Sequence, residues 1–494
     1  MPGDHLVIVG GGLAGLSAGC YGRASGLRTT IVEHNLGLGG VCTAWSRGPY
    51  TVDGCIHWLT GGPFDRIYRE LGILPDVSVH VLDRFATYRD VESGVTVELG
   101  KDIDGFARAL AALSPRDEAE LLRMVEGARA LAVLGPPMDQ PPELASFRES
   151  VGMLWGMREQ LGTLIHFRKP AGTWLEENFT SPVVRRVLGR FAPAEAPALF
   201  LLMVLGYLEA GQLSRPDGGT RRFRDALIDR YERLGGETRL HETVDEILVE
   251  RDRVTGVRLS DGTEIPADWV ISTSSAPETV LRLLGGKYGA SEVRRRLETW
   301  KLFDPIVLAS YGVAAPLAHV PSTLVLDHVP RLRIGDRQND VLRLRVYNDD
   351  PSLAPPGHTV IQAILETDYA HWARLGHRYT AEKDAVAETV LRHIETYVPE
   401  VKGNVRMTDV ATPLTYFHMA RSYRGAFEGW MPNGEAFFGH VKKTLPGLAA
   451  FYMAGQWVEP GGGVPPALLS GRQAVQILCA EAKREFSSPV AVFD

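Results

Sequence analysis

A short apolar run that stops abruptly at glycines opens the chain. Residues Leu6–Val9 read LVIV, as a parallel strand buried on both faces requires. Gly10, Gly12 and Gly15 then fit G-x-G-x-x-G, and the residues after them recur at helical spacing. A helix that begins here offers unpaired N–H groups and a positive dipole end, and the glycines let a pyrophosphate approach the backbone. The pattern predicts a strand, a tight turn and a phosphate-binding helix.

A second strand and an acidic residue complete this unit. Residues Thr29–Val32 read TTIV and end at Glu33, roughly 20 residues beyond the glycines. An acidic side chain at this place accepts hydrogen bonds from ribose hydroxyls. Strand, glycines, helix, strand and acid follow one another in the order that dinucleotide binding demands. The start of the chain therefore predicts a dinucleotide site.

A second glycine cluster indicates which dinucleotide is bound. Gly37, Gly39 and Gly40 lie in LGLGGVCT, and an Asp-Gly pair follows in YTVDGCIHWLTG. These segments resemble the FAD-binding signature of the large flavoprotein oxidoreductase superfamily rather than that of NAD dehydrogenases. Many amine-oxidase relatives carry Arg directly after the two glycines, whereas Val41 stands here. This departure favours the phytoene desaturase branch of the superfamily.

The end of the chain carries the same resemblance. The segment 445–481 contains a strand that ends at Ala454-Gly455, a loop with three glycines, and Pro465-Pro466 opening a helix. Its GGGVPPALLSGR is very similar to the C-terminal motif of phytoene desaturases, carotenoid isomerases and retinol saturases. Gln456 departs from the acidic or small residue that relatives often have there. A helix N-terminus at this point can stabilise negative charge on a reduced flavin.

The resemblance implies FAD as cofactor, and no metal site is predicted. It implies that Val244 gives backbone hydrogen bonds to the adenine and that the strand ending at Ser272 runs beside the cofactor. The predicted cofactor-binding residues are Gly10, Gly12, Leu13, Ala14, Gly15, Glu33, His34, Gly39, Gly40, Val41, Val244, Ser272, Gly455, Gln456, Gly463, Val464 and Pro465.

The predicted fold class is α/β, with a Rossmann-like FAD-binding domain of the two-dinucleotide-binding-domain type. An α+β substrate domain contains an antiparallel sheet over about 299–412, a helix over Ala381–Pro399 and a helical insert over about 115–210. Because the chain is too long for one core, the two domains are expected to be built from alternating segments. The FAD-binding domain is assigned to 1–75, 215–285 and 445–494, and the substrate domain to 76–214 and 286–444.

Two local features of the insert lead to specific expectations. Ser114 is expected to cap a long helix whose first turn contains Pro115. The apolar stretch Ala198–Leu208 is read first as a core helix. The alternative is that it lines an apolar tunnel or dips into one membrane leaflet, assisted by nearby aromatic and basic residues, namely Trp155, Arg158, Phe167, Arg168 and Lys169.

The net charge and the cysteine content bear on the class of binding partner and on the cellular compartment. The formal net charge is -7 with both signs interspersed, which argues against nucleic acid as a partner. The four cysteines, Cys20, Cys42, Cys55 and Cys479, have neither disulfide-framework nor metal-ligand spacing. Reduced thiols indicate a cytoplasmic protein, with peripheral membrane contact as an added expectation. No stretch approaches the roughly 20 apolar residues that span a bilayer.

The resemblance implies flavin redox chemistry at carbon. The expected reaction is desaturation, saturation or isomerisation of a C–C bond in a hydrophobic, isoprenoid- or carotenoid-like small molecule. Only one dinucleotide motif is present, so dioxygen or a quinone is expected as the electron acceptor. His57 is a candidate for proton transfer because its ordinary pKa suits that role, although a structural histidine is the alternative. Tyr416 and Arg421, with His418 between them, are further catalytic candidates expected to face the substrate.

Two other functions stay open. A flavin amine oxidase is the alternative enzyme, weakened by Val41 and by the end of the chain. Rab GDP-dissociation inhibitors and escort proteins share this fold and bind prenylated partners without redox chemistry, which makes a lipid-binding protein the alternative of another class. The intact glycine motifs favour an enzyme, because a binding protein has little reason to keep them.

Overall fold

A five-stranded parallel sheet forms the centre of one half of the molecule. The computed structural model describes residues 4–492. All neighbouring strands of this sheet pair in parallel, and β1 is buried along its whole length. The strand order is β10 (Glu237–Leu240), β2 (Arg28–Glu33), β1 (His5–Val9), β14 (Trp269–Ser272) and β20 (Phe451–Met453).

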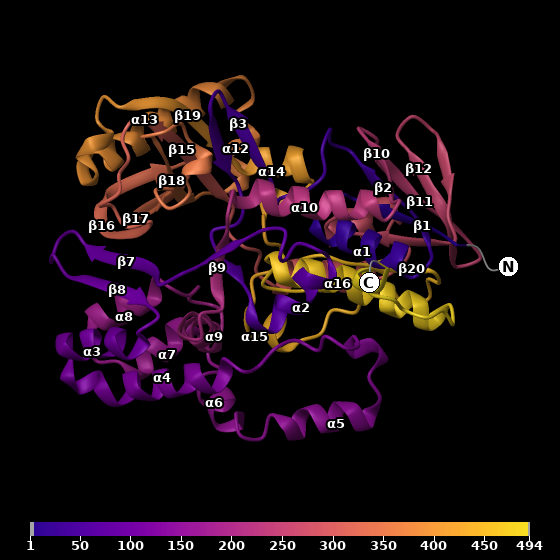
Figure 1. Cartoon of the computed structure of the whole chain (residues 1–494), viewed down its shortest axis with the longest axis horizontal. Coiled ribbons are helices and arrows are strands. Elements are labelled where there is room, and N and C mark those ends of the chain that lie inside the picture. Colours follow the sequence, from indigo (N-terminus) through magenta and orange to yellow (C-terminus); the bar gives the residue numbers. More distant parts are fainter. Residues whose placement is uncertain (1–3, 493–494) are drawn as a thin grey trace.

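Three long helices pack with this sheet. α1 (Leu13–Ala24) lies between α10 (Gly219–Arg233) and α16 (Val464–Glu481) and contacts both (Figure 1). A Cβ on Gly471 of α16 would lie 2.4 Å from the Ala14 carbonyl oxygen, so α16 approaches α1 more closely than a larger residue permits. The α/β fold class is confirmed, and these elements come from widely separated parts of the chain.

Three smaller sheets surround this centre. A hairpin turn at Asp261-Gly262 joins two of their strands, and Gly262 has a φ of +87°. The sheets consist of β11 (Val244–Glu250), β12 (Arg253–Leu259) and β13 (Glu264–Pro266); of β3 (Ala44–Arg47) and β4 (Tyr50–Asp53); and of β5 (Leu59–Thr60), β9 (Leu213–Pro216) and β6 (Val79–Val81).

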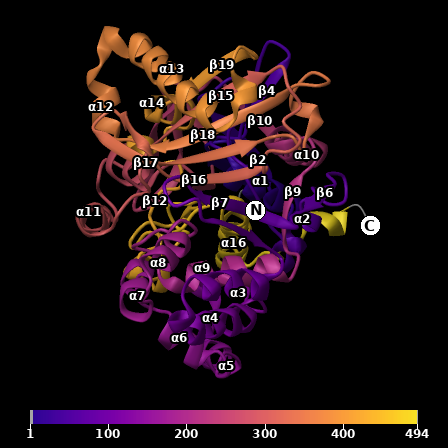
Figure 2. The ribbon, with the colours of Figure 1, turned by 90° about the vertical axis from the view of Figure 1, so that its left-hand side faces the viewer.

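A seven-stranded sheet forms the second half of the molecule. Its order is β19 (Val405–Ala411), β15 (Ile306–Val313), β18 (Thr359–Glu366), β17 (Arg337–Val346), β16 (Thr323–Ile334), β7 (Arg84–Asp90) and β8 (Thr96–Gly100). The sheet predicted over 299–412 is present, but it continues into β7 and β8, and β7 pairs with β16 in parallel. Helices α12 (Tyr369–Arg374) and α13 (Tyr379–Tyr397) cover one face (Figure 2).

The helical insert lies below this sheet in Figure 2. Ser114 makes no side-chain capping hydrogen bond, because a 3-10 turn over Pro115–Asp117 precedes α4; its predicted capping role is wrong. Helix α3 was not predicted from the sequence; Asp102 caps it by accepting the Gly105 N–H at 2.7 Å. The helices are α3 (Ile103–Leu113), α4 (Glu118–Leu131), α5 (Phe147–Gly156), α6 (Leu161–His166), α7 (Ala171–Asn178), α8 (Pro182–Gly189) and α9 (Ala198–Glu209).

Helix α9 is the core of this insert. It packs against α4, and a Cβ on Gly127 of α4 would lie 2.7 Å from Leu202 Cδ2. Nine of its residues, among them Leu205 and Leu208, are buried. The core reading of Ala198–Leu208 is confirmed, and the alternative that this stretch enters a membrane leaflet is wrong. Phe167, expected near a membrane surface, is also buried.

The remaining helices connect these parts. They are α2 (Asp65–Glu70), a π-helix over Pro277–Leu283, α11 (Ala290–Thr299), α14 (Pro413–Ala420) and α15 (Gly434–Phe438). Within residues 4–492, no helix combines the length and the apolarity that crossing a bilayer requires.

Candidate functional site

The first glycine loop leaves an open space in front of α1. Among the described residues, a Cβ on Gly12 would meet only the Gly40 Cα within 4 Å, at 3.9 Å. Gly10 has a φ of +99°, and a Cβ there would lie 2.6 Å from Thr273 Oγ1. A Cβ on Gly15 would lie 2.1 Å from the Gly10 carbonyl oxygen. Gly10 and Gly15 are therefore required for chain packing, whereas Gly12 leaves room that a pyrophosphate can occupy.

The second glycine cluster lies against the first. The Gly39 N–H donates to the Gly11 carbonyl at 2.8 Å. Gly40 has a φ of +59°, and a Cβ on it would lie 3.1 Å from the Gly12 Cα. Only glycine permits this approach, so both clusters border the same space, with Val41 half-buried beside them.

Glu33 ends β2 beside the glycine loop. Its carboxylate accepts the N–H groups of Gly11 at 2.7 Å and Asn35 at 2.9 Å, and His34 Nδ1 lies 2.8 Å away. Burial opposes ionisation, but the hydrogen bonds from His34, Gly11 and Asn35 outweigh it and lower the pKa of Glu33. The hydrogen bond with Glu33 in turn raises the pKa of His34. This carboxylate fastens the glycine loop, and its contact with a ribose stays a prediction.

The N-terminus of α16 borders the same region. Gly463 precedes the helix with a φ of +98°, and a Cβ on it would meet only Pro466 Cδ at 3.9 Å among the described residues. The Gly455 N–H donates to Ser470 Oγ at 2.7 Å, and a Cβ on Gly455 would lie 3.7 Å from the Ala14 Cβ. Two helix N-termini and two glycine loops therefore flank one cradle, as binding of FAD requires.

Val244 and Ser272 occupy the predicted strands. The Val244 carbonyl accepts a hydrogen bond from Arg282 Nη2 at 3.1 Å. Ser272 ends β14, and its buried hydroxyl lies 2.8 Å from Thr279 Oγ1. The backbone of Val244 and the strand of Ser272 are thus held by protein groups, and their contacts with adenine and flavin stay predictions.

Three partly accessible side chains lie near the closing glycine loop. Cys55, His57 and Glu428 lie deep in the chain, yet each keeps part of its surface accessible. A Cβ on Gly462 would lie 2.8 Å from the Glu428 Cβ, so this acidic residue stands against the loop. A hydrogen bond with Cys42, burial and neighbouring acids including Glu428 raise the pKa of the Cys55 thiol.

Glu428 is a functional candidate that the sequence analysis missed. Burial raises the pKa of its carboxyl to about 7. Within residues 4–492, no hydrogen-bond or ion-pair partner of this carboxyl is found. A carboxyl with this pKa exchanges a proton readily near neutral pH. The only signal in the sequence was one acid within the aromatic run GAFEGW, ahead of the closing glycine segment.

His57 has a different electrostatic environment from the one expected. Burial and the positive charges of Arg345 and Arg215 lower the pKa of His57 to about 4. The expectation that its ordinary pKa suits proton transfer is therefore wrong, because the imidazole is neutral at physiological pH. Its Nε2 atom has no hydrogen-bond partner among the described residues. Its carbonyl accepts from Arg215 Nε at 2.9 Å.

The other catalytic candidates do not form one group. Tyr416 is buried in α14, where burial and Cys55 raise its pKa. His34 Nε2 lies 3.0 Å from the His418 carbonyl, and Arg421 is exposed close to His34. Tyr416 thus lies toward Cys55, whereas His418 and Arg421 lie at the Glu33 end of the cradle rather than beside Cys55 and Glu428.

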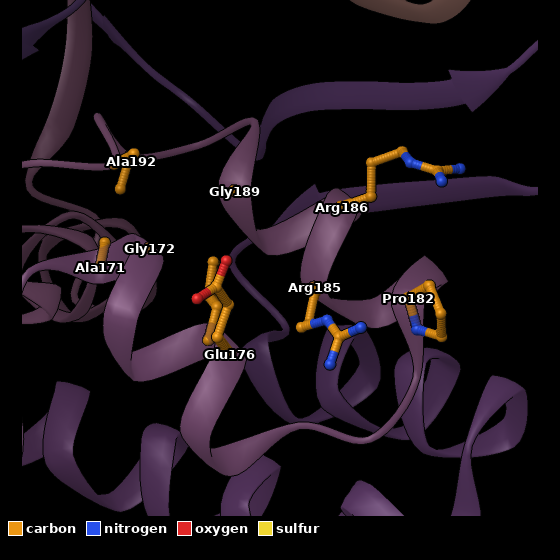
Figure 3. A pocket seen from close by; sticks show the side chains of 10 residues that line it. Ala171, Gly172, Glu176, Pro182, Arg185, Arg186, Gly189 and Ala192 are labelled. Atoms are coloured by element: carbon orange, nitrogen blue, oxygen red, sulfur yellow. The ribbon is translucent and has the colours of Figure 1, made fainter.

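A hollow elsewhere in the molecule is separate from this site. It lies between α7 and α8 and is lined by residues including Glu176, Arg185 and Gly189 (Figure 3). Both helices belong to the insert and lie far from α1 and α16 (Figure 1). The cradle between the glycine loops, rather than this hollow, therefore matches the cofactor motifs.

Comparisons with known proteins agree with these features. The chain is 21% identical to a phytoene desaturase (lycopene-forming) of Pseudescherichia vulneris, over 96% of this chain and 98% of that protein. It is 24% identical to a 4,4'-diaponeurosporene oxygenase of Staphylococcus aureus, over 97% of this chain and 99% of that protein. The crystal structure of cyclohexylamine oxidase from Brevibacterium oxydans, 16% identical, shares the fold with a TM-score of 0.62, covering 98% of this chain and 100% of that chain.

A family description matches almost the whole chain. The family is described as flavin containing amine oxidoreductase, and the match extends over residues 13–479. The paired glycine loops and the open space at Gly12 fit the FAD that this family implies. The chain is therefore an FAD-dependent oxidoreductase that belongs to the flavin-containing amine oxidoreductase family, with phytoene desaturases among its relatives.

Proposed function

We propose that this oxidoreductase acts on a carbon–carbon bond of a hydrophobic, isoprenoid-like substrate, with removal of two hydrogens as the forward reaction. The observation that carries the proposal is the similarity, over nearly the whole chain, to two enzymes named for phytoene and for 4,4'-diaponeurosporene. The region around Cys55, His57 and Glu428 is the proposed place of the reacting bond. The flavin is then regenerated by dioxygen or a quinone.

Glu428 is the proposed proton acceptor of this reaction. FAD bound between the glycine loops supplies a hydride acceptor. One carbon of the substrate loses a hydride, the neighbouring carbon gives a proton to the Glu428 carboxylate, and the electron pair of that second C–H bond forms the double bond. The position of Glu428 against Gly462 supports this role, since it brings the carboxyl to the closing cofactor loop.

Anaerobic incubation of the FAD-loaded protein with a panel of small molecules tests the function. Polyenes and terpenoids, phytoene included, are expected to bleach the flavin for at least one member, while amines and amino acids leave it oxidised. Bleaching by amines alone contradicts the proposal and supports an amine oxidase. If no member bleaches oxidised flavin, reoxidation of chemically reduced enzyme by a polyene supports the reverse reaction, and no reoxidation by any polyene contradicts the proposal.

We also propose that the protein docks on a membrane from the cytoplasmic side. Helices α5 and α6 expose Phe147, Val151, Trp155, Leu161 and Ile165, here called the apolar edge; Phe147 is 84% and Trp155 70% exposed. Arg148 and Arg158 stand beside Glu149 and Glu159, and Arg168 and Lys169, which follow the segment, give it an excess of positive charge that suits anionic lipid. The Arg158 guanidinium lies 5.9 Å from the Trp155 ring centre. Figure 1 shows α5 standing apart from the rest of the molecule.

Flotation with lipid vesicles tests the membrane contact. The protein is expected to float with vesicles containing phosphatidylglycerol and to lose this binding when Phe147 and Trp155 are both replaced by Ser. The matched control is Leu122→Ser, because Leu122 is 52% exposed on α4, outside the apolar edge. Equal flotation of all three proteins, or none with anionic vesicles, contradicts the docking proposal and leaves the proposed reaction untouched.

A further inference from the structure

One face of the seven-stranded sheet carries buried charge. Leu342, Leu344 and Val346 of β17 pack in the cluster that contains α13. Side chains alternate along a strand, so Arg345 lies on the opposite face. Gln362 Nε2 on that face donates to the Asp53 carbonyl at 2.8 Å, which places the face against the segment that leads to His57. The charged face therefore adjoins the proposed reaction space.

Arg345 is almost completely buried, and its N–H groups are not all hydrogen-bonded among the described residues. Its side chain is 4% exposed. Nη1 donates to the Ser322 carbonyl at 2.8 Å and also to the Val346 carbonyl, and Nη2 donates to Asp349 at 2.7 Å. The guanidinium carbon lies 4.2 Å from the Tyr347 ring centre. Nε has no hydrogen-bond partner among the described residues, which costs free energy unless a ligand accepts this bond.

A second guanidinium lies beside the first. Arg215 also bonds Asp349, donates through Nη2 to Thr323 Oγ1 at 3.1 Å and through Nε to the His57 carbonyl at 2.9 Å. Burial and the nearby Arg345 lower the pKa of Arg215 to about 10, so it stays charged at neutral pH. The buried guanidinium groups of Arg215 and Arg345 are thus both bonded to one carboxylate, that of Asp349.

The carboxylate of Asp53, which also lies nearby, already accepts three hydrogen bonds. Asp53 accepts the Thr220 N–H at 2.7 Å, the Thr220 hydroxyl at 2.6 Å and the Cys55 N–H at 3.2 Å. Asp53 is also close enough to Arg345 for their charges to interact. Burial and the positive charges of both arginines lower the pKa of His57, whose Nε2 has no hydrogen-bond partner among the described residues. Positive charge and two unpartnered nitrogens, on Arg345 and His57, therefore occur together beside the proposed place of the reacting bond.

We infer that Arg345, Arg215 and His57 form a seat for a carboxylate of the substrate. The inference rests on the proposed function and narrows its substrate class to amphipathic acids, in which a hydrophobic chain carries a carboxylate at one end. A carboxylate oxygen accepts a hydrogen bond from Arg345 Nε, and the neutral His57 imidazole donates through Nε2. Charge-assisted bonds of this kind are about twice as strong as neutral ones, so they select the acid over an uncharged analogue.

Binding of oleate and oleyl alcohol to the FAD-loaded protein tests the carboxylate seat. Both probes are titrated below their critical micelle concentrations at pH 7.5, with the flavin difference spectrum and calorimetry as readouts. We expect the Kd for oleate to be at least tenfold lower than that for oleyl alcohol. Arg345→Gln is expected to remove this preference. Equal affinity of the wild-type protein for the two probes overturns the inference.

Two further variants show whether a lost preference for oleate comes from the carboxylate seat or from general damage to the fold. Arg337→Gln removes a cation from the edge of the same strand, where Arg337 bonds Asp304 at 2.6 Å, and is expected to keep the preference. If Arg345→Gln does not fold, His57→Leu must lower the preference by removing the other donor, and an unchanged preference overturns the inference. If the protein prefers oleate but no panel member reduces the flavin, the carboxylate seat is supported and the proposed reaction is contradicted. If a hydrocarbon reduces the flavin but the protein does not prefer oleate, the proposed reaction is supported and the carboxylate seat is contradicted.

Discussion

Gly40 approaches Gly12 so closely that a Cβ on Gly40 would lie 3.1 Å from the Gly12 Cα, whereas a Cβ on Gly12 would meet only the Gly40 Cα, at 3.9 Å, among the described residues. The variant Gly12→Val should therefore fold but place two methyl groups where the pyrophosphate binds. We expect FAD occupancy, measured from absorbance at 450 nm after gel filtration, to fall by at least about tenfold. Full occupancy would show that the cradle is misplaced. Gly162→Val, at another position without neighbours for a Cβ, is the control.

Glu428 should control the pH dependence of flavin reduction. Its pKa is raised to about 7, so the carboxylate that accepts the proton becomes available as the pH rises through 7. The rate of anaerobic reduction should rise with pH and level off above that value. Glu428→Gln should slow it by about 10²–10⁴-fold and remove this dependence. An unchanged profile in stopped-flow absorbance would exclude the role.

The same group should make the protein less stable at high pH. The pKa of Glu428 is about 7 in the folded chain and 4.5 ordinarily, so the folded state binds more protons between these values. Stability is therefore lost as the pH rises through this window. Glu428→Gln should raise the free energy of unfolding by about 1–3 kcal/mol at pH 8 and change it little at pH 4. Urea denaturation of the FAD-free protein at both pH values measures this difference.

Arg472 should hold α16 in place through a buried carboxylate. Arg472 Nε donates to Glu70 at 2.9 Å, and the Tyr21 hydroxyl donates to the same oxygen at 2.6 Å. Arg472→Met removes one of the two guanidinium groups bonded to Glu70, the other being Arg66, whose Nε donates to Glu70 at 2.8 Å. The loss should cost about 1–3 kcal/mol in denaturant unfolding. The double variant with Glu70→Gln should recover part of this loss. Additive losses would show that the two residues do not interact.

Helix α9 should behave as core rather than as a membrane contact. Leu202 is completely buried, so Leu202→Ala should destabilise the protein by about 2–5 kcal/mol. Leu122→Ala, at an exposed site on α4, should change stability by about 0.5 kcal/mol or less. Similar losses for the two variants in thermal or urea unfolding would contradict the packing of α4 on α9.

The cofactor cradle could be predicted from the sequence because its determinants are local. Gly10, Gly12 and Gly15 follow one strand directly, and Glu33 ends the next, so short-range patterns and the strand–turn–helix context were sufficient. The helix at Val464 was marked in the same way by glycines before it and prolines in its first turn. The family resemblance added the identity of the dinucleotide.

The environment of the reaction space could not be predicted, because it depends on distant segments. The low pKa of His57 comes from burial and from Arg345 and Arg215, which belong to β17 and β9. Burial gives Glu428 its pKa, and nothing in the residue type shows burial. The parallel pairing of β7 with β16 joins two remote stretches and leaves no local pattern. Long-range contacts of this kind require the folded structure.

The most direct test of the proposed reaction is the product of a single anaerobic turnover. The FAD-loaded protein is mixed with the panel member that bleaches it, and the organic product is analysed by mass spectrometry. We predict one equivalent of a product two hydrogens lighter, with a new C=C bond, for each flavin reduced. Recovery of a deaminated product, or of unchanged hydrocarbon beside reduced flavin, would contradict oxidation of a carbon–carbon bond.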